Sequence, residues 1–233
     1  MKQRRFFILL GVSLAVILFL VHLAMIDDYG LTWDFHHHFF AGLHLIGHPI
    51  SADLTQYIPF TEPDPRRTYM LPFGPLMSLA PVASYMLFFE KLKLLAFDNA
   101  YNLTVIASGV VGVLILYGFL LETTTPATAI VGFIFLALLP RYWADIHNNM
   151  KDVPQAAAYA LSIWMFWRLV KHQRVKDLML AALAAAIAFN TKVNTISMPV
   201  VGFMWLMILL MMKKKLSRRG IVFGFFLAAP AAA

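Results

Sequence analysis

The sequence alternates between long apolar runs and short polar stretches, which is typical of a membrane protein. A transmembrane helix needs roughly 20 mostly apolar residues, and several runs approach or reach this length. We therefore predict an all-α, polytopic helical bundle that forms a single transmembrane domain over residues 1–233. The predicted spans are Phe6–Ile26, Ala100–Leu121, Pro126–Trp143, Val153–Val170, Leu178–Asn190 and Thr195–Met212, and a further apolar stretch begins at Gly220.

The composition agrees with this prediction and excludes a soluble enzyme. The chain is 61% hydrophobic and 13% charged, whereas an ordinary globular domain is about 45–50% apolar and 25% charged. It has no cysteine, which excludes a disulfide scaffold and a thiolate metal site. The net charge of +7 does not indicate a nucleic-acid partner, because the basic residues form short clusters between apolar runs, where they set membrane topology.

One apolar segment, Met70–Phe97, contains three prolines and three charged residues. If this segment does not cross the membrane, 12 of the 19 basic residues lie inside and 7 outside, as the positive-inside rule favours. We therefore predict a cytoplasmic N-terminus. Residues 27–97 then form one long external loop with juxtamembrane or re-entrant helices.

The first external loop begins with three carboxylates, Asp27, Asp28 and Asp34. A carboxylate just beyond a span can be desolvated enough to act as a general base. Asp27 and Asp28 can equally well face water at the end of the span. Asp34 lies beyond a Tyr-Gly turn and beside an interfacial tryptophan, and it is the stronger candidate.

Residues Phe35–Ile46 have the pattern of an amphipathic interfacial helix. The apolar residues on one side of it are Phe39, Phe40, Leu43 and Ile46. Its histidines leave a metal site open as an alternative, although three adjacent histidines cannot all face one ion on a helix.

A second polar cluster, between two predicted spans, contains His147, Asn149, Lys151 and Asp152. Asp152 stands where the N-cap of the next helix belongs, and this structural role would account for it. The same role does not account for His147 and Lys151, which are spaced four apart. We interpret the cluster as functional.

Two further groups of cations are candidates for binding an anion. Lys192 lies between two apolar helices on the predicted external side, where a lone cation indicates an anionic partner such as a lipid phosphate. Alternatively, it snorkels from a helix end. Arg66 and Arg67 can bind substrate or can pair with acidic residues next to them in sequence.

These motifs resemble those of bacterial glycosyltransferases of the GT-C fold, in the family 39 group related to protein O-mannosyltransferases and aminoarabinose transferases. Gly30–Asp34 is similar to a Gly-x-Thr-Trp-Asp-Glu stretch of the family, with Phe35 in place of the glutamate. His147–Pro154 is similar to its stretch that begins with histidine and ends in Lys-Asp-x-Pro. Phe189–Asn194 is similar to its helix ending in Thr-Lys-Tyr/Val-Asn.

The resemblance implies transfer of a sugar from a polyprenyl-phosphate carrier to an acceptor hydroxyl at the external face of the bacterial inner membrane. It implies Asp34 as the catalytic base, Asp152 as a second catalytic acid, and Asp28 as the alternative acid. The expected substrate-binding residues are His147, Asn149, Lys151, Lys192, Arg66 and Arg67. A divalent cation is a possible aid, but oxygen ligands alone do not establish one.

Family members run about twice this length, so we expect the chain to be the N-terminal portion of a longer enzyme. Two alternatives stay open, a transporter or flippase of lipid-linked sugars and a non-catalytic truncated relic. A transporter needs polar residues along a path through the spans. Because the spans are nearly free of charge and the ionisable residues concentrate at one interface, the sequence favours surface chemistry.

Overall fold

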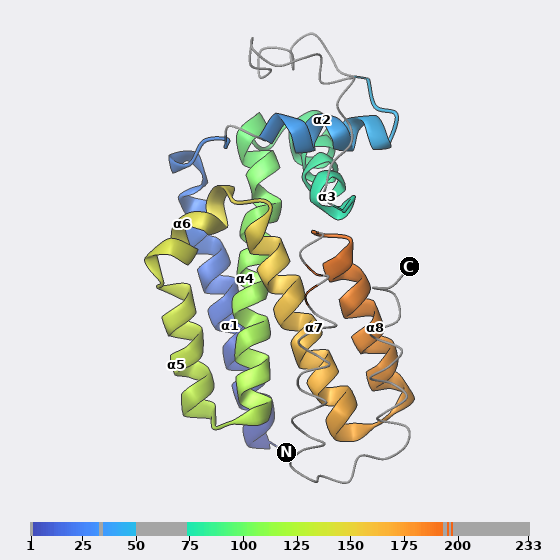
Figure 1. The fold of residues 1–233 in the computed structure, drawn as a ribbon. Coiled ribbons are helices and arrows are strands. Elements are labelled where there is room, and N and C mark those ends of the chain that lie inside the picture. Colours follow the sequence, from blue (N-terminus) through green and yellow to red (C-terminus); the bar gives the residue numbers. More distant parts are fainter. Residues whose placement is uncertain (1, 33–34, 50–73, 193–194, 196, 198–233) are drawn as a thin grey trace.

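A computed structural model describes residues 2–32, 35–49, 74–192, 195 and 197 (Figure 1). The helices are α1 (Lys2–Ala24), a 3-10 helix η1 (Ile26–Asp28), α2 (Phe35–Leu45), α3 (Leu76–Ser84), a π-helix η4 (Tyr85–Lys91), α4 (Phe97–Thr123), α5 (Pro126–Ala137), α6 (Pro140–Asn148), α7 (Asp152–His172) and α8 (Val175–Phe189). Within these ranges there is no strand, and the all-α prediction is confirmed.

Five helices, α1, α4, α5, α7 and α8, run side by side as a bundle (Figure 1). The central helix is α4, which packs against α1, α5 and α7, and α7 packs in turn against α8. In the described residues, Gln3–Ala24 and Phe97–Thr123 are each long and apolar enough to cross a membrane. The bent pair α5 and α6 adds a third span if it is counted as one.

The predicted span Pro126–Trp143 is divided between two helices. The axes of α5 and α6 differ by 63°. Leu139 adopts an extended conformation at the break, because the ring of Pro140 disfavours a helical conformation in the residue before it. The predicted span Thr195–Met212 and the stretch from Gly220 lie almost wholly outside the described residues.

Two glycines in α4 allow α6 and α7 to pack close to it. A Cβ at Gly109 would collide with the side chain of Ile146. A Cβ at Gly112 would lie 2.6 Å from Tyr142 Oη and 3.2 Å from Ala157 Cβ. Tyr142 Oη also donates a 2.9 Å hydrogen bond to the Gly109 carbonyl. These contacts fix α6 on α4 and so position the loop that follows α6.

One end of the bundle, here called the α2 end, holds the end of α1, the starts of α4 and α7, and the end of α8 (Figure 1). Helix α2 lies across it (Figure 1), and its position at a membrane interface stays a prediction. Three of the four apolar residues predicted on one side of α2 are fully buried, namely Phe39, Phe40 and Leu43. The fourth, Ile46, lies past the end of the helix and is 46% exposed, so its predicted placement is wrong.

Helix α3 and η4 occupy most of the segment Met70–Phe97, and they pack at the α2 end against α2 and α4. The start of α4 also contacts the linker that follows α1. Asn99 Nδ2 donates a hydrogen bond to Asp27, and Asn102 Nδ2 donates one to the Gly30 carbonyl at 3.3 Å. The end of α1 and the start of α4 therefore lie together. This arrangement supports the prediction that Met70–Phe97 does not cross the membrane. That residues 27–97 form an external loop stays a prediction.

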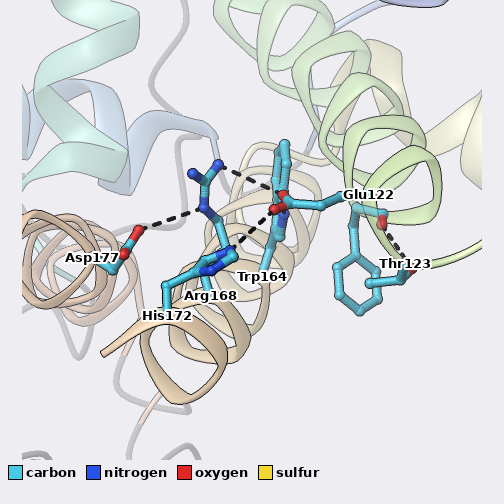
Figure 2. Close-up of polar contacts among 7 residues, drawn as sticks. Glu122, Thr123, Trp164, Arg168, His172 and Asp177 are labelled. Atoms are coloured by element: carbon cyan, nitrogen blue, oxygen red, sulfur yellow. Dashed lines mark hydrogen bonds and ion pairs between the residues drawn. The ribbon is translucent and has the colours of Figure 1, made fainter. Parts of the chain in front are cut away.

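Charged side chains also meet at the opposite end of the bundle (Figure 2). Arg168 lies 3.6 Å from Glu122 and 3.7 Å from Asp177, and His172 lies 3.7 Å from Glu122. Trp164 Nε1 donates a 2.9 Å hydrogen bond to Glu122. This group joins α4, α7 and α8. The expectation that ionisable residues concentrate at one interface is therefore wrong, because Arg168 lies inside a predicted span and pairs with carboxylates from two other helices.

Candidate active site

Asp152, Asn149 and Lys192 form a hydrogen-bonded group at the α2 end. Asp152 begins α7 and Lys192 follows the end of α8, so the antiparallel packing of these two helices brings them together. Lys192 Nζ donates to Asp152 Oδ1 at 2.6 Å, and Asn149 Nδ2 donates to Asp152 Oδ2 at 3.3 Å. The structure thus joins three residues that the sequence places in the site.

The side chain that caps α7 is that of Asn149. Asn149 Oδ1 accepts a 3.0 Å hydrogen bond from the backbone N–H of Asp152, which is the first residue of the helix. Lys151 occupies the N-cap position but makes no side-chain capping bond there. The interpretation of Asp152 as the N-cap is therefore wrong. Its carboxylate contacts Lys192 and Asn149 and is 61% exposed.

The hydrogen bond from Lys192 lowers the pKa of the Asp152 carboxyl below its ordinary value of 3.8. Partial burial raises this pKa, but the hydrogen bonds from Lys192 and Asn149 outweigh that effect. Asp152 is therefore ionised at neutral pH and can accept a hydrogen bond from a hydroxyl. An ammonium has three donor hydrogens, so the Lys192 side chain can bridge Asp152 and a phosphate oxygen.

His147 is turned away from this group and toward α1. Its Nε2 lies 3.1 Å from His22 Nδ1, and its Nδ1 lies 3.1 Å from the Trp143 carbonyl. Tyr29 stacks on the ring, with centroids 3.7 Å apart and planes 3° from parallel. The ring of His147 is fully buried. Its predicted contact with substrate stays a prediction.

The linker after α1 carries the alternative acid. Asp28 lies close enough to His147 to interact with its ring electrostatically. Asp27 accepts a hydrogen bond from Asn99, which gives it a structural role at the start of α4. Three predicted site residues lie outside the described residues, namely Asp34, Arg66 and Arg67.

Residues close to Asp152 and Lys192 in the chain line one cavity, and Asp152 itself lines a second. The first has a volume of about 410 Å³ and lies between α3, α4, α7 and α8. Its walls are mainly apolar and include Met77, Pro81, Val111, Ile115, Met150 and Ile187. Thr191, next to Lys192 in the chain, also lines it. The second, about 400 Å³, runs along α7 from Asp152 to Ile163. Charged groups beside apolar cavities are suited to an amphipathic ligand.

Two residues near the site were not identified from the sequence, His22 and Gln155. His22 is an ionisable residue inside an otherwise apolar span, a signal that indicates a functional role. Gln155 lies with Asp152 and Tyr159 along the second cavity, and Gln155 Nε2 donates a 2.6 Å hydrogen bond to Thr195. Asp152, Gln155 and Tyr159 are spaced three and four residues apart, which places them on one face of a helix. This spacing could have identified Gln155 from the sequence.

The described residues contain no group of three or more histidine or carboxylate side chains that could hold a metal ion. The described geometry therefore gives no support to the divalent cation or to the histidine metal site that the sequence left open.

Comparison with known proteins adds one finding. Residues 78–233 match the model of a family described as dolichyl-phosphate-mannose-protein mannosyltransferase, which is about two thirds of the chain. The chain belongs to this family. No curated protein and no solved structure gives a significant match.

Membership of the mannosyltransferase family confirms the resemblance to GT-C enzymes and identifies the chain as a membrane glycosyltransferase of this type. The matched region contains His147, Asp152 and Lys192. It begins after the linker that carries Asp28 and Asp34, so the match gives no information on these two carboxylates.

Proposed function

We propose that the chain transfers a sugar from a polyprenyl-phosphate carrier to an acceptor hydroxyl at the external face of the bacterial inner membrane. The bond between sugar C1 and the phosphate oxygen breaks, and a bond between C1 and the acceptor oxygen forms. The acceptor proton passes to a carboxylate, and the phosphate leaves on its lipid. Family membership supports sugar transfer, and the geometry of the α2 end supports this carrier.

The observation that carries the proposal is the Asp152–Lys192 pair, with Thr191, the residue before Lys192, lining the first, mainly apolar cavity and Asp152 lining the second. A polyprenyl phosphate has an anionic head and a long apolar tail. The Lys192 ammonium would stabilise the negative charge that develops on the leaving phosphate. The apolar walls of the first cavity would accept the part of the tail nearest the head, since burial of each methylene group contributes about 0.8 kcal/mol.

The other predicted residues take the following roles in the proposal. Asp34 acts as the general base toward the acceptor, and Asp152 orients the acceptor hydroxyl or the sugar through its ionised carboxylate. Asn149 holds the Asp152 carboxylate in place through its 3.3 Å hydrogen bond. Additional binding contacts to the phosphate or the sugar come from Lys151, Arg66 and Arg67. His147, whose ring is buried and whose two ring nitrogens have partners within the protein, acts through its neighbours instead.

The test is a transfer assay with the full chain in liposomes. The donor is radiolabelled polyprenyl-phosphate mannose, and the two acceptor arms are a serine- and threonine-rich peptide and lipid A. We expect label to reach one acceptor as polyprenyl phosphate is released. The expected order of rates is wild type equal to Lys176→Gln, which changes an exposed lysine at the opposite end, and both well above Lys192→Gln. Movement of intact donor across the bilayer without transfer would instead indicate the transporter alternative.

A further inference from the structure

His22 is a fully buried histidine in the last turn of α1. Polar ionisable residues in apolar spans are costly and are found mainly where they have a partner and a role. The partner here is His147, whose Nε2 lies 3.1 Å from His22 Nδ1. The His22 ring also packs on Trp143, with centroids 4.3 Å apart. His22 therefore joins α1 to α6 at the α2 end.

The hydrogen bonds fix which ring nitrogens carry protons. The Trp143 carbonyl can only accept, so His147 Nδ1 must donate to it. In a neutral His147, Nε2 is then the acceptor, and His22 Nδ1–H must be its donor. The remaining nitrogen, His22 Nε2, is buried and has no hydrogen-bond partner in the part of the chain that the structure describes. The hydrogen bonds therefore run from donor to acceptor in one direction, from His22 to His147 and from His147 to the Trp143 carbonyl.

His147 in turn contacts the linker between α1 and the first predicted loop. Its ring lies flat against Tyr29, with centroids 3.7 Å apart. Tyr29 directly follows Asp28, which lies close enough to His147 to interact with its ring electrostatically. A rotation of the His147 ring would remove the stacking surface for Tyr29. The orientation of His147 therefore affects the course of the linker at Asp28 and Tyr29.

We infer that His22 is a positioning residue for the transferase site. By donating from Nδ1 to His147 Nε2, it holds the His147 ring flat under Tyr29 and so places the described part of the linker, which carries Asp28. This inference rests on the proposed function for its effect on turnover. The link between His22 and His147 is a separate claim, and it can be measured without any substrate.

Two substitutions separate the nitrogens of His22. In His22→Asn, the side-chain amide occupies the place of Nδ1 and can still donate to His147. In His22→Gln, the amide reaches the place of Nε2 instead. We expect His22→Asn to retain transfer within about threefold and His22→Gln to lower kcat roughly 10–100-fold, with little change in KM for polyprenyl-phosphate mannose, because small misplacements of reacting groups have effects of this size.

The second readout is nitrogen-15 NMR of the histidine rings in bilayers, with His147→Gln to assign the signal. We expect His147 to carry its proton on Nδ1 in wild type and in His22→Asn, and to change its Nε2 shift in His22→Gln. Equal turnover of the two His22 variants, or a proton on His147 Nε2 in wild type, would overturn the inference. The expected NMR result without any transfer by wild type would contradict the proposed function while supporting the His22–His147 link.

Discussion

The side chains of Asp152 and Lys192 are 40 positions apart in sequence and meet at 2.6 Å across the α7–α8 hairpin. One residue starts a helix and the other follows the end of its antiparallel neighbour. This pairing places a carboxylate and an ammonium together at the α2 end, where Asp152 lines one cavity and Thr191, next to Lys192 in the chain, lines another. The glycosyltransferase proposal depends on this relationship more than on any other contact.

The first prediction concerns topology. The chain has no native cysteine, so single cysteines give clean labelling. Cysteines in place of Ser51 and Asn148 should both react with an impermeant reagent from the external side. A cysteine in place of Lys176 should react only after the membrane is opened. Labelling of positions 51 and 148 from opposite sides would mean that Met70–Phe97 crosses the membrane.

The second prediction concerns the general base. Asp34→Asn retains the size of the side chain but removes the base, so turnover should fall by about 10²–10⁴-fold with little change in donor binding. Asp28→Asn should reduce turnover far less. Asp27→Asn should act mainly on stability, because Asp27 accepts a hydrogen bond from Asn99. Full turnover of Asp34→Asn, together with loss of turnover in Asp28→Asn, would assign the base to Asp28.

The third prediction concerns the ionisation of Asp152. The hydrogen bond from Lys192 holds the pKa of Asp152 below 3.8, so the pair stabilises the folded protein above the unfolded-state pKa, and this contribution is lost as the pH falls through the folded-state pKa. Because Asp152 is 61% exposed, the contribution is small, about 0–1 kcal/mol. Carbon-13 NMR of the carboxyl should show a higher pKa in Lys192→Gln than in wild type. An unchanged pKa would mean that the two side chains do not pair.

The fourth prediction concerns stability at the opposite end of the bundle. Asp177 is 1% exposed and lies 3.7 Å from Arg168. Arg168→Met should destabilise the fold by roughly 3–5 kcal/mol, because it removes one partner of a buried ion pair. The double variant Arg168→Met/Asp177→Leu should recover most of this loss. Thermal unfolding in detergent measures both, with Arg174→Met as the exposed control. Equal melting of the Arg168 and Arg174 variants would contradict the prediction.

The helices could be predicted from the sequence because each depends on a local apolar run. The predicted spans Val153–Val170 and Leu178–Asn190 fall on helices α7 and α8, although neither helix is among those in the described residues that are long and apolar enough to cross a membrane. The bend between α5 and α6 was not predicted, because the apolar pattern of Pro126–Trp143 predicts one span, although Pro140 restricts the residue before it and so indicated a break. Helix α2 itself was predicted, but not the burial of its polar residues His36 and His38 together with its apolar ones.

The side-chain partnerships could be predicted only in part. Topology placed Asp152 and Lys192 on one side of the membrane, but their contact depends on how α7 packs against α8. The direction of His147 was not predictable, because its partner His22 is 125 positions away. Capping by Asn149 was missed because Asp152 and Asn149 are both good capping residues, and only the backbone path selects between them.

The binding of polyprenyl phosphate by Lys192 tests the account most directly. Binding of a fluorescent polyprenyl phosphate to the full chain in nanodiscs should weaken about 10–100-fold in Lys192→Gln, because a hydrogen bond to a charged group contributes about 1.5–3 kcal/mol. Binding should be unchanged in Lys176→Gln. Equal affinities of wild type and the Lys192 variant would contradict a carrier site at the Asp152–Lys192 pair.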